Sequence, residues 1–180
     1  MQSSYRDYKV IISGPSGAGK STAIAVISDT SLFGTDVKPS DRSYNQKPLT
    51  TVALDFGVIH VSEQERVHLY GTPGQERFGF MWEILSYGGL GLILLLDNSR
   101  SDPLRDLSFF LDTYEEFIGK TKIVIGVAHM ALNPLPSLED YHERLKDFGL
   151  NPALFEVDAR NKNDLLILLQ SLLFSIDPGF

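Results

Sequence analysis

The sequence predicts one α/β domain over residues 1–180, with a mostly parallel six-stranded sheet, one antiparallel edge strand and helices on both faces. Strand-like apolar runs alternate with helix-like segments, which is the pattern of parallel strands joined by helical crossovers. Two strand-like runs are instead joined directly by a short polar turn, which predicts one antiparallel edge strand. No repeat, low-complexity segment or long linker divides the 180 residues, and this length suits a single domain.

The first half of the chain is expected to supply three strands and two helices. The polar residues 62–65, Ser-Glu-Gln-Glu, form the hairpin turn between the second and third strands. Residues 30–48 are polar and contain proline and serine, so we expect a loop there. The predicted strands cover residues 8–13, 51–61 and 66–70, and the predicted helices cover residues 21–29 and the later part of 75–86.

The second half continues the alternation and carries clear helix-end signals. Asp102 is a candidate N-cap, and Pro103 suits the first position of the helix that follows. Ser137 is a second candidate N-cap, and Gly149 follows the end of that helix. Residues 91–96 are aliphatic almost throughout, which predicts a strand buried on both faces. The predicted strands cover 91–96, 122–127 and 153–157, and the helices cover 103–118, 137–148 and 163–173.

Composition narrows the classes of function. The residues are 43% hydrophobic and 22% charged, as in soluble globular proteins. A formal charge of −7 argues against a general nucleic-acid surface, which needs Lys and Arg. The absence of cysteine excludes disulfides and thiolate metal sites and fits a reducing cytoplasm. The longest apolar run, 90–96, is far shorter than the roughly 20 residues that span a bilayer. We therefore expect a cytoplasmic protein with no nucleic-acid partner and no direct membrane insertion.

Residues 14–21, Gly-Pro-Ser-Gly-Ala-Gly-Lys-Ser, match the phosphate-binding pattern G-x-x-x-x-G-K-S/T in full. The glycines let backbone N–H groups turn toward a phosphate, and the helix that follows points its positive end at the anion. Lys20 would reach the β- and γ-phosphate oxygens, and Ser21 would ligate Mg²⁺. The candidate phosphate-side residues are Gly14, Ser16, Gly17, Ala18, Gly19, Lys20, Ser21 and Thr22.

Three further segments complete a resemblance to the Ras-like small GTPases over nearly the whole chain. Residues 51–56 (TVALDF) resemble T-I-G-V-D-F after the first switch, and residues 71–78 (GTPGQERF) resemble D-T-x-G-Q-E-R-F of the second switch. Residues 158–160 (DAR) resemble the S-A-K guanine loop. The glycine at the start of GTPGQ makes this segment similar to that of a bacterial Ras-like branch, whose members are often found with Roadblock/LC7-type partner proteins.

The resemblance implies GTP and GDP as ligands with Mg²⁺, and it implies a role for each matching residue. Thr51 would give its hydroxyl to Mg²⁺ and its N–H to the γ-phosphate, with Thr50 as the competing choice. Gly74 would bond the γ-phosphate through its N–H, and Gln75 would orient the attacking water. Ala159 would contact the guanine O6 through its amide. The implied catalytic residues are Gln75, Lys20 and Thr51, and the implied base-side residues are His129, Met130, Asp158, Ala159 and Arg160.

One departure from the family pattern concerns the metal. Gly71 stands where the family has the Asp that holds Mg²⁺ through a water. The ion would then depend on Ser21, Thr51, phosphate oxygens and water, and we expect weaker metal affinity. Alternatively, Asp55 or Asp97 lies near the metal. Asp97 ends an aliphatic strand in the manner of a Walker-B acid.

A second departure concerns the base. The family reads guanine with N-K-x-D, and residues 128–131 are Ala-His-Met-Ala. Ala131 replaces the Asp that bonds guanine twice, and Ala128 replaces the bracing Asn. Each bond to a charged partner is worth about 1.5–3 kcal/mol, so guanine discrimination falls by roughly tenfold to several hundredfold. His129 would pack its ring over the base or the loop, and Asn133 is a candidate substitute contact.

The leading hypothesis is a guanine-nucleotide switch with slow GTP hydrolysis, whose conformation is read by an effector or activating protein. Arg42 is a candidate arginine for hydrolysis. One alternative is a pseudo-GTPase scaffold with weak or base-unselective binding, and another is a P-loop ATPase that uses Asp97. The aromatic residues Phe78, Phe80 and Trp82 form either core or a partner surface opened by the switch.

Overall fold

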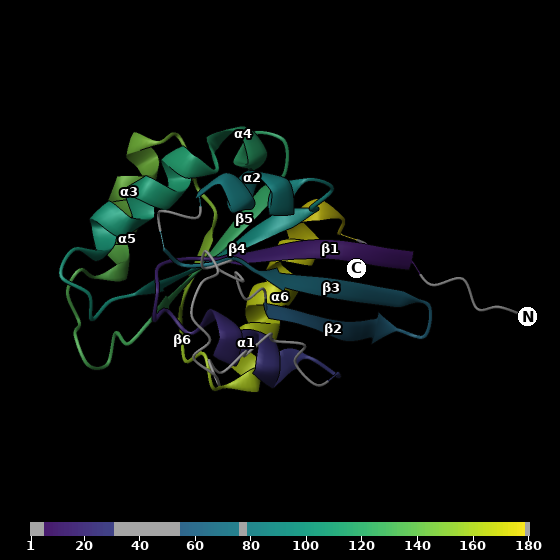
Figure 1. Cartoon of the computed structure of the whole chain (residues 1–180). Helices are drawn as coiled ribbons and strands as arrows, with labels where there is room; N and C mark the ends of the chain where they lie inside the picture. Colours follow the sequence, from purple (N-terminus) through teal and green to yellow (C-terminus); the bar gives the residue numbers. More distant parts are fainter. Residues whose placement is uncertain (1–5, 31–54, 76–78, 179–180) are drawn as a thin grey trace, which may run out of the picture.

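The computed structural model describes residues 6–30, 55–75 and 79–178, apart from the Phe80 side chain, and the predicted α/β fold is confirmed there. A six-stranded sheet has the order β2-β3-β1-β4-β5-β6 (Figure 1). Only β2 and β3 pair antiparallel, which places the antiparallel strand at an edge as expected. The strands are β1 (Arg6–Ser13), β2 (Asp55–Ser62), β3 (Glu65–Gly71), β4 (Gly91–Asp97), β5 (Lys122–Ala128) and β6 (Ala153–Val157).

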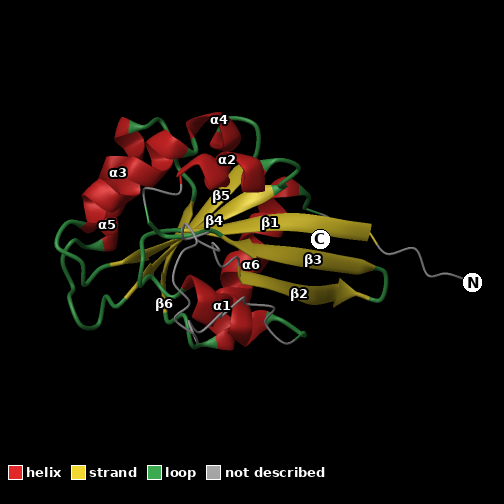
Figure 2. Ribbon diagram, viewed as in Figure 1, coloured by secondary structure: helices red, strands yellow, loops and turns green. Residues whose placement is uncertain are grey.

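Helices cover both faces of the sheet (Figure 2). One face packs against α1 and α6, and the other packs against the group α2 to α5. None of the helices within the described ranges is long and apolar enough to cross a bilayer. The helices are α1 (Lys20–Ile27), α2 (Gly79–Ser86), α3 (Pro103–Thr113), α4 (Glu115–Ile118), α5 (Leu138–Asp147) and α6 (Lys162–Ile176).

The two cores are built by alternate residues of the central strands. In β1, Val10 and Ile12 belong to the core under α1 and α6, whereas Ile11 belongs to the core under α2 to α5. All seven residues of β4 are buried, which confirms the expectation from their aliphatic character. Successive side chains of a strand point to opposite faces, so an unbroken apolar run here fills two cores at once.

The helix expected over 103–118 is in fact two helices, because the chain leaves helical geometry at Tyr114, with φ −99° and ψ 12°. The Tyr114 ring is buried, and its hydroxyl donates a hydrogen bond to Oγ of Ser13 at the end of β1. The predicted start of the first helix is correct, since the Asp102 carboxylate accepts a hydrogen bond from the backbone N–H of Arg105.

The other helix-end predictions also hold. Ser137 and Asp140 form a capping box at the start of α5, each side chain bonding the other's backbone N–H. Gly149 adopts φ +67° just after that helix, a value that glycine reaches without a Cβ clash. The expected loop over 30–48 and the first residues of the expected strand over 51–61 lie almost wholly outside the described residues.

Five parallel strands end along one edge of the sheet. The loop after β1, the segment after β3 and the loops after β4, β5 and β6 all begin at this edge. In open α/β sheets, ligands bind beyond the carboxyl ends of the strands. The segments singled out in the sequence therefore meet where a ligand is expected.

Candidate nucleotide site

The glycine loop between β1 and α1 has the conformation that its sequence predicts. Gly14, Gly17 and Gly19 have φ of +143°, +87° and +87°, values that residues with a Cβ rarely adopt. A Cβ on Gly14 would also overlap the carbonyl oxygen of Leu95, because the loop passes closely over β4. The loop can thus turn its backbone amides inward only because these positions are glycine.

The Lys20 side chain lies across this loop and is almost fully buried. Its Nζ donates hydrogen bonds to the carbonyl oxygens of Gly14 and Pro15, at 2.8 and 2.7 Å. Burial lowers the pKa of Lys20 from 10.5 to about 8, while the charge of Asp55 acts to raise it and that of Arg100 to lower it. The ammonium is therefore held on the loop as a cation at neutral pH, ready for an anion.

The segment after β3 packs directly on the glycine loop. Thr72 donates its N–H to the carbonyl of Ile12 and its hydroxyl to Oγ of Ser13, at 2.9 and 2.8 Å. A Cβ on Gly74 would lie 2.5 Å from the Ser16 nitrogen and 2.6 Å from Lys20 Nζ. Position 74 thus needs glycine because its backbone lies against the loop.

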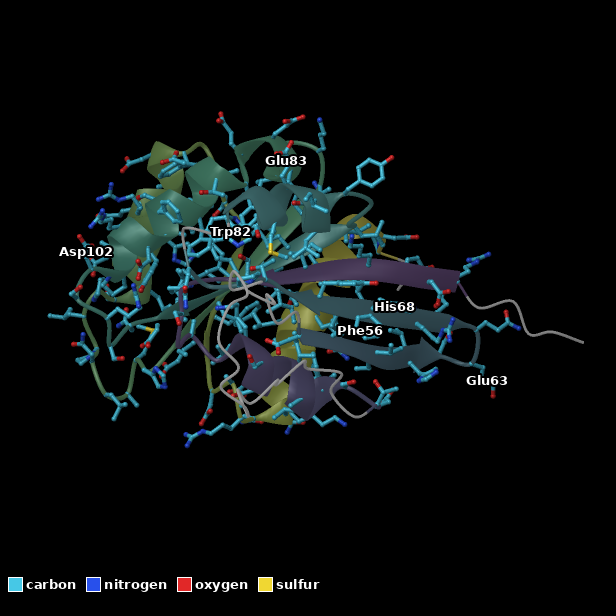
Figure 3. The ribbon with its side chains drawn as sticks, viewed as in Figure 1. Phe56, Glu63, His68, Trp82, Glu83 and Asp102 are labelled. Atoms are coloured by element: carbon cyan, nitrogen blue, oxygen red, sulfur yellow. The ribbon has the colours of Figure 1, made fainter. Side chains whose placement is uncertain are left out.

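The remaining residues of the second-switch segment, and the helix after it, follow Gly74 in the chain. Gln75 comes next in the chain and is exposed, while residues 76–78 lie outside the described part. Trp82 is core, since it is 1% exposed and packs against Phe110 and Tyr114. Figure 3 shows its ring directed into the molecule beneath α2, where Nε1 donates to the Pro73 carbonyl at 2.8 Å.

Of the two acids considered for the metal, Asp55 lies beside Ser21. The Ser21 hydroxyl donates a 2.6 Å hydrogen bond to Oδ2 of Asp55. Hydroxyl and carboxylate oxygens fit Mg²⁺, which is usually held by one or two protein groups together with phosphate and water. Among residues 6–30, 55–75 and 79–178 there is no group of three or more His, Cys, Asp or Glu that could hold a metal ion without a nucleotide. Thr51 and Thr50 lie outside those ranges.

Asp97 is engaged elsewhere, on the loop that follows β5. His129 Nδ1 lies 2.8 Å from Oδ1 of Asp97, and Ser99 donates both its N–H and its hydroxyl to the same oxygen. Burial acts to raise the pKa of Asp97, but these hydrogen bonds outweigh it and the net pKa is lowered. The carboxylate thereby orients the His129 ring, whose backbone has a left-handed φ of 63°.

A cavity of about 720 Å³ lies beside the glycine loop, where the resemblance places the base. It brings together the end of the glycine loop, the loop after β5 and the loop after β6. All five predicted base-side residues line it, and so does the methyl group of Ala131. The lining residues are Gly17, Ala18, Gly19, Thr22, Ala128, His129, Met130, Ala131, Leu132, Glu156, Val157, Asp158, Ala159, Arg160 and Asp164.

The loop after β6 is fastened to the glycine loop and closed on itself. A Cβ on Gly19 would lie 2.6 Å from Cβ of Ala159, so the two loops touch. Arg160 donates to both carboxylate oxygens of Asp158, at 2.9 and 2.7 Å, and these bonds lower the pKa of Asp158 to about 2. The carboxylate of Asp158 is thus paired with Arg160.

Two residues near the site were not identified from the sequence. Asn98 is fully buried and donates to the carbonyls of Asn133 and Pro136, while its own carbonyl accepts from the Asn133 amide. The Asn133 side chain therefore braces the loop after β5, and the residue does not line the cavity. Arg100 lies 3.4 Å from the Ser16 carbonyl and 2.5 Å from Asp106. The contact with Ser16 has no local sequence signal, because 84 positions separate the two residues.

A glycine loop between β1 and α1, with its lysine folded over it at the carboxyl edge of this sheet, defines a P-loop nucleotide-binding protein. A family model described as "Conserved hypothetical ATP binding protein" matches residues 35–125, just over half of the chain. The chain belongs to that family.

The chain is also similar to individual proteins, two of which are Ras-related proteins. RabC of Dictyostelium discoideum is 23% identical over 94% of this chain and 84% of its own length, and Rab-18-B of Danio rerio is 23% identical over 95% and 80%. The uncharacterized protein MJ1339 of Methanocaldococcus jannaschii is 33% identical over 56% of this chain. This chain spans 57% of the length of that relative.

Proposed function

We propose that the protein is a single-domain guanine-nucleotide switch of the cytoplasm, in which GTP and GDP bind with Mg²⁺ and a partner protein reads the bound state. One observation carries the proposal. The backbone of Gly74 lies against both the Ser16 nitrogen and Lys20 Nζ, so the segment after β3 rests on the place where a terminal phosphate would bind. A phosphoryl group that arrives or leaves there must hold or release this segment.

Each residue then has a defined task in binding. The backbone amides of residues 14–19 and the Lys20 ammonium bind the phosphates, and Ser21 and Thr51 hold the metal. Gly74 donates its N–H to the γ-phosphate. When bound, Mg²⁺ neutralises charge on the phosphate oxygens. The cavity beside the loop takes the base, against His129, Met130 and Ala159.

Hydrolysis is proposed to be slow. Gln75 follows Gly74 directly and is exposed, a place from which it can orient a water toward the terminal phosphate. Lys20 and Thr51 would share the stabilisation of the reacting phosphoryl group. A glutamine without an arginine leaves transition-state charge uncompensated, so rapid turnover needs another protein or an arginine such as Arg42.

The surface next to the switch segment supports a protein partner. Ile84 on α2 and Tyr87, the residue that directly follows α2, are 69% and 87% exposed, although both carry large apolar groups. On the inner side of the same helix, Trp82 is bonded to the Pro73 carbonyl. A shift of the switch segment would therefore move α2. The partner is proposed to be an effector or activating protein, with the Roadblock/LC7 type as the first candidate.

The second candidate function is a scaffold that binds nucleotides with little regard to the base. Ala131 lines the cavity at the position where the Ras-like GTPases have their guanine-reading carboxylate. In addition, the name of the family whose model matches this chain refers to ATP. The ATPase that uses Asp97 loses support, because that carboxylate is bonded to His129 and Ser99.

Titration of fluorescently labelled GDP, GTP and ATP with Mg²⁺, followed by single-turnover phosphate release, tests the proposal. A guanine preference above about tenfold with slow release supports the switch. Equal affinities and no release support the scaffold. Failure to bind any of the three nucleotides overturns both.

A further inference from the structure

The space of the side chain missing at position 71 is filled by Ile24 and Asp55, and a Cβ there would lie 2.8 Å from Cδ1 of Ile24. A Cβ on Gly71 would lie 2.9 Å from Cβ of Asp55 and 3.3 Å from its Oδ2. Atoms at 2.9 Å overlap, so positions 55 and 71 cannot both carry side chains in this arrangement. The absence of a side chain at 71 therefore leaves room for the carboxylate at 55.

The strand pairing places the two positions side by side. Asp55 is the first residue of β2, Gly71 is the last residue of β3, and the antiparallel register places them directly opposite each other. Side chains of directly opposed residues point to the same face of a sheet. A carboxylate at 55 therefore stands on the same face and at the same end of the sheet as one at 71 would.

The carboxylate at 55 faces the phosphate side of the site. Its Oδ2 accepts the 2.6 Å hydrogen bond from Ser21, the hydroxyl that the phosphate-loop pattern assigns to Mg²⁺. Its charge also reaches Lys20, whose pKa it acts to raise. Asp55 thus contacts one partner of the metal and influences the cation beside it.

We propose that Asp55 is the metal-side carboxylate of this protein, a role transposed across the β2–β3 pair from position 71, and that with Ser21 it holds Mg²⁺ in the nucleotide complex. The inference rests on the proposed nucleotide function and adds a residue to its metal site. The ion is thereby tied to the strand that follows the first switch segment, instead of to the end of β3.

The test is the Mg²⁺ dependence of nucleotide release from the full chain. The dissociation rate of fluorescent GDP is measured over a range of free Mg²⁺, from an EDTA solution upward. The isosteric variant Asp55→Asn is expected to need at least about tenfold more Mg²⁺ than wild type for half-maximal slowing, because a neutral amide is a poor partner for this cation.

Asp7→Asn is the matched control. It removes a carboxylate from the opposite end of the sheet, where Asp7 accepts hydrogen bonds from Arg66 at 2.8 and 3.0 Å. Its Mg²⁺ curve should coincide with that of wild type. If Asp55→Asn also coincides with wild type, Asp55 does not hold the ion and the Ser21 contact is only structural.

A transposition variant decides the matter even if Asp55→Asn folds poorly. Asp55→Gly combined with Gly71→Asp moves the carboxylate to the position of the family's metal-side Asp and removes the overlap with Asp55, and it should return the Mg²⁺ curve to within about threefold of wild type. Gly71→Asp alone should lower thermal stability, because both side chains then compete for one space. A double variant that is folded but insensitive to Mg²⁺ would overturn the inference.

The outcomes for wild type separate the two levels of the proposal. If wild type binds GDP and its release rate ignores Mg²⁺, the nucleotide function stands and the transposed metal site is wrong. If wild type binds no nucleotide at all, the proposed function fails, and the metal site fails with it.

Discussion

The phosphate half and the base half of the site are built differently, although both lie on the same edge of the sheet. In the phosphate half, three glycines at positive φ shape a loop of backbone amides, and Lys20 lies over it. In the base half, Ala128 and Ala131 occupy the two positions where the Ras-like GTPases have Asn and Asp. The first half matches the phosphate-loop pattern in full, whereas the second lacks the Asn and Asp of the guanine-reading pattern.

The difference teaches that nucleotide affinity and base selectivity are separable. Phosphate capture depends on main-chain N–H groups and one cation, which any base allows. Guanine discrimination depends on a side-chain carboxylate that can accept two hydrogen bonds, and the methyl group of Ala131 cannot. The following predictions test this division between the two halves, beginning with the largest effect.

Lys20→Ala should abolish triphosphate binding, with a loss of about a hundredfold or more. Two charge-assisted bonds to phosphate are worth about 1.5–3 kcal/mol each. The measurement is equilibrium titration with labelled GTP and Mg²⁺. Lys146→Ala, which removes an exposed lysine from α5, is the control and should bind as wild type does. Retained micromolar affinity in Lys20→Ala would falsify the role of the phosphate loop.

Ala131→Asp should raise the preference for GDP over ADP by roughly tenfold to several hundredfold, because it restores the bidentate partner of guanine. Competition titrations with the two diphosphates measure the ratio. Leu132→Asp places the same charge on the neighbouring residue of the cavity lining, which is 79% exposed, and should leave the ratio unchanged. An equal gain in both variants would show a general charge effect instead of base reading.

Alkaline pH should weaken GDP binding by about tenfold for each unit above pH 8. Burial lowers the pKa of free Lys20 to about 8, whereas bound phosphates keep the ammonium charged, so binding above that pH must take up a proton. Titrations between pH 7.5 and about 9.5 measure the slope. Lys20→Arg stays charged over this range and should show the smaller slope of the nucleotide's own titration.

The same pKa has an opposite consequence for the stability of the free protein. The folded pKa of Lys20 lies below its ordinary value of 10.5, so the unfolded chain binds more protons between about pH 8 and 10.5. The contribution of Lys20 to the free energy of unfolding therefore rises with pH in that window. Comparison of thermal unfolding in wild type and Lys20→Arg isolates it, and an identical pH dependence of the two would contradict the shift.

Much of the fold follows from local patterns. Apolar runs located all six strands, and Asp102, Ser137 and Gly149 marked helix ends correctly because caps act on their own neighbours. The segment 103–118 is helical as expected except at Tyr114, where it divides into two helices and where the tyrosine hydroxyl bonds to Ser13, 101 positions away in the chain. A local pattern contains no information about such a partner.

The site residues also fall into two groups: those that the sequence pattern identified and those that only the tertiary structure placed. The sequence alone determined the phosphate loop, since glycines at set spacings and one lysine define both its backbone shape and its charge. It left Asp55 and Asp97 as equal candidates for the metal, and it offered Asn133 as a contact to the base. Tertiary structure placed Asp55 beside Ser21, Asp97 beside His129 and Asn133 against Asn98. The physical reason is range: backbone shape is set by neighbouring residues, whereas a carboxylate acquires its role from whatever the strand register brings opposite it.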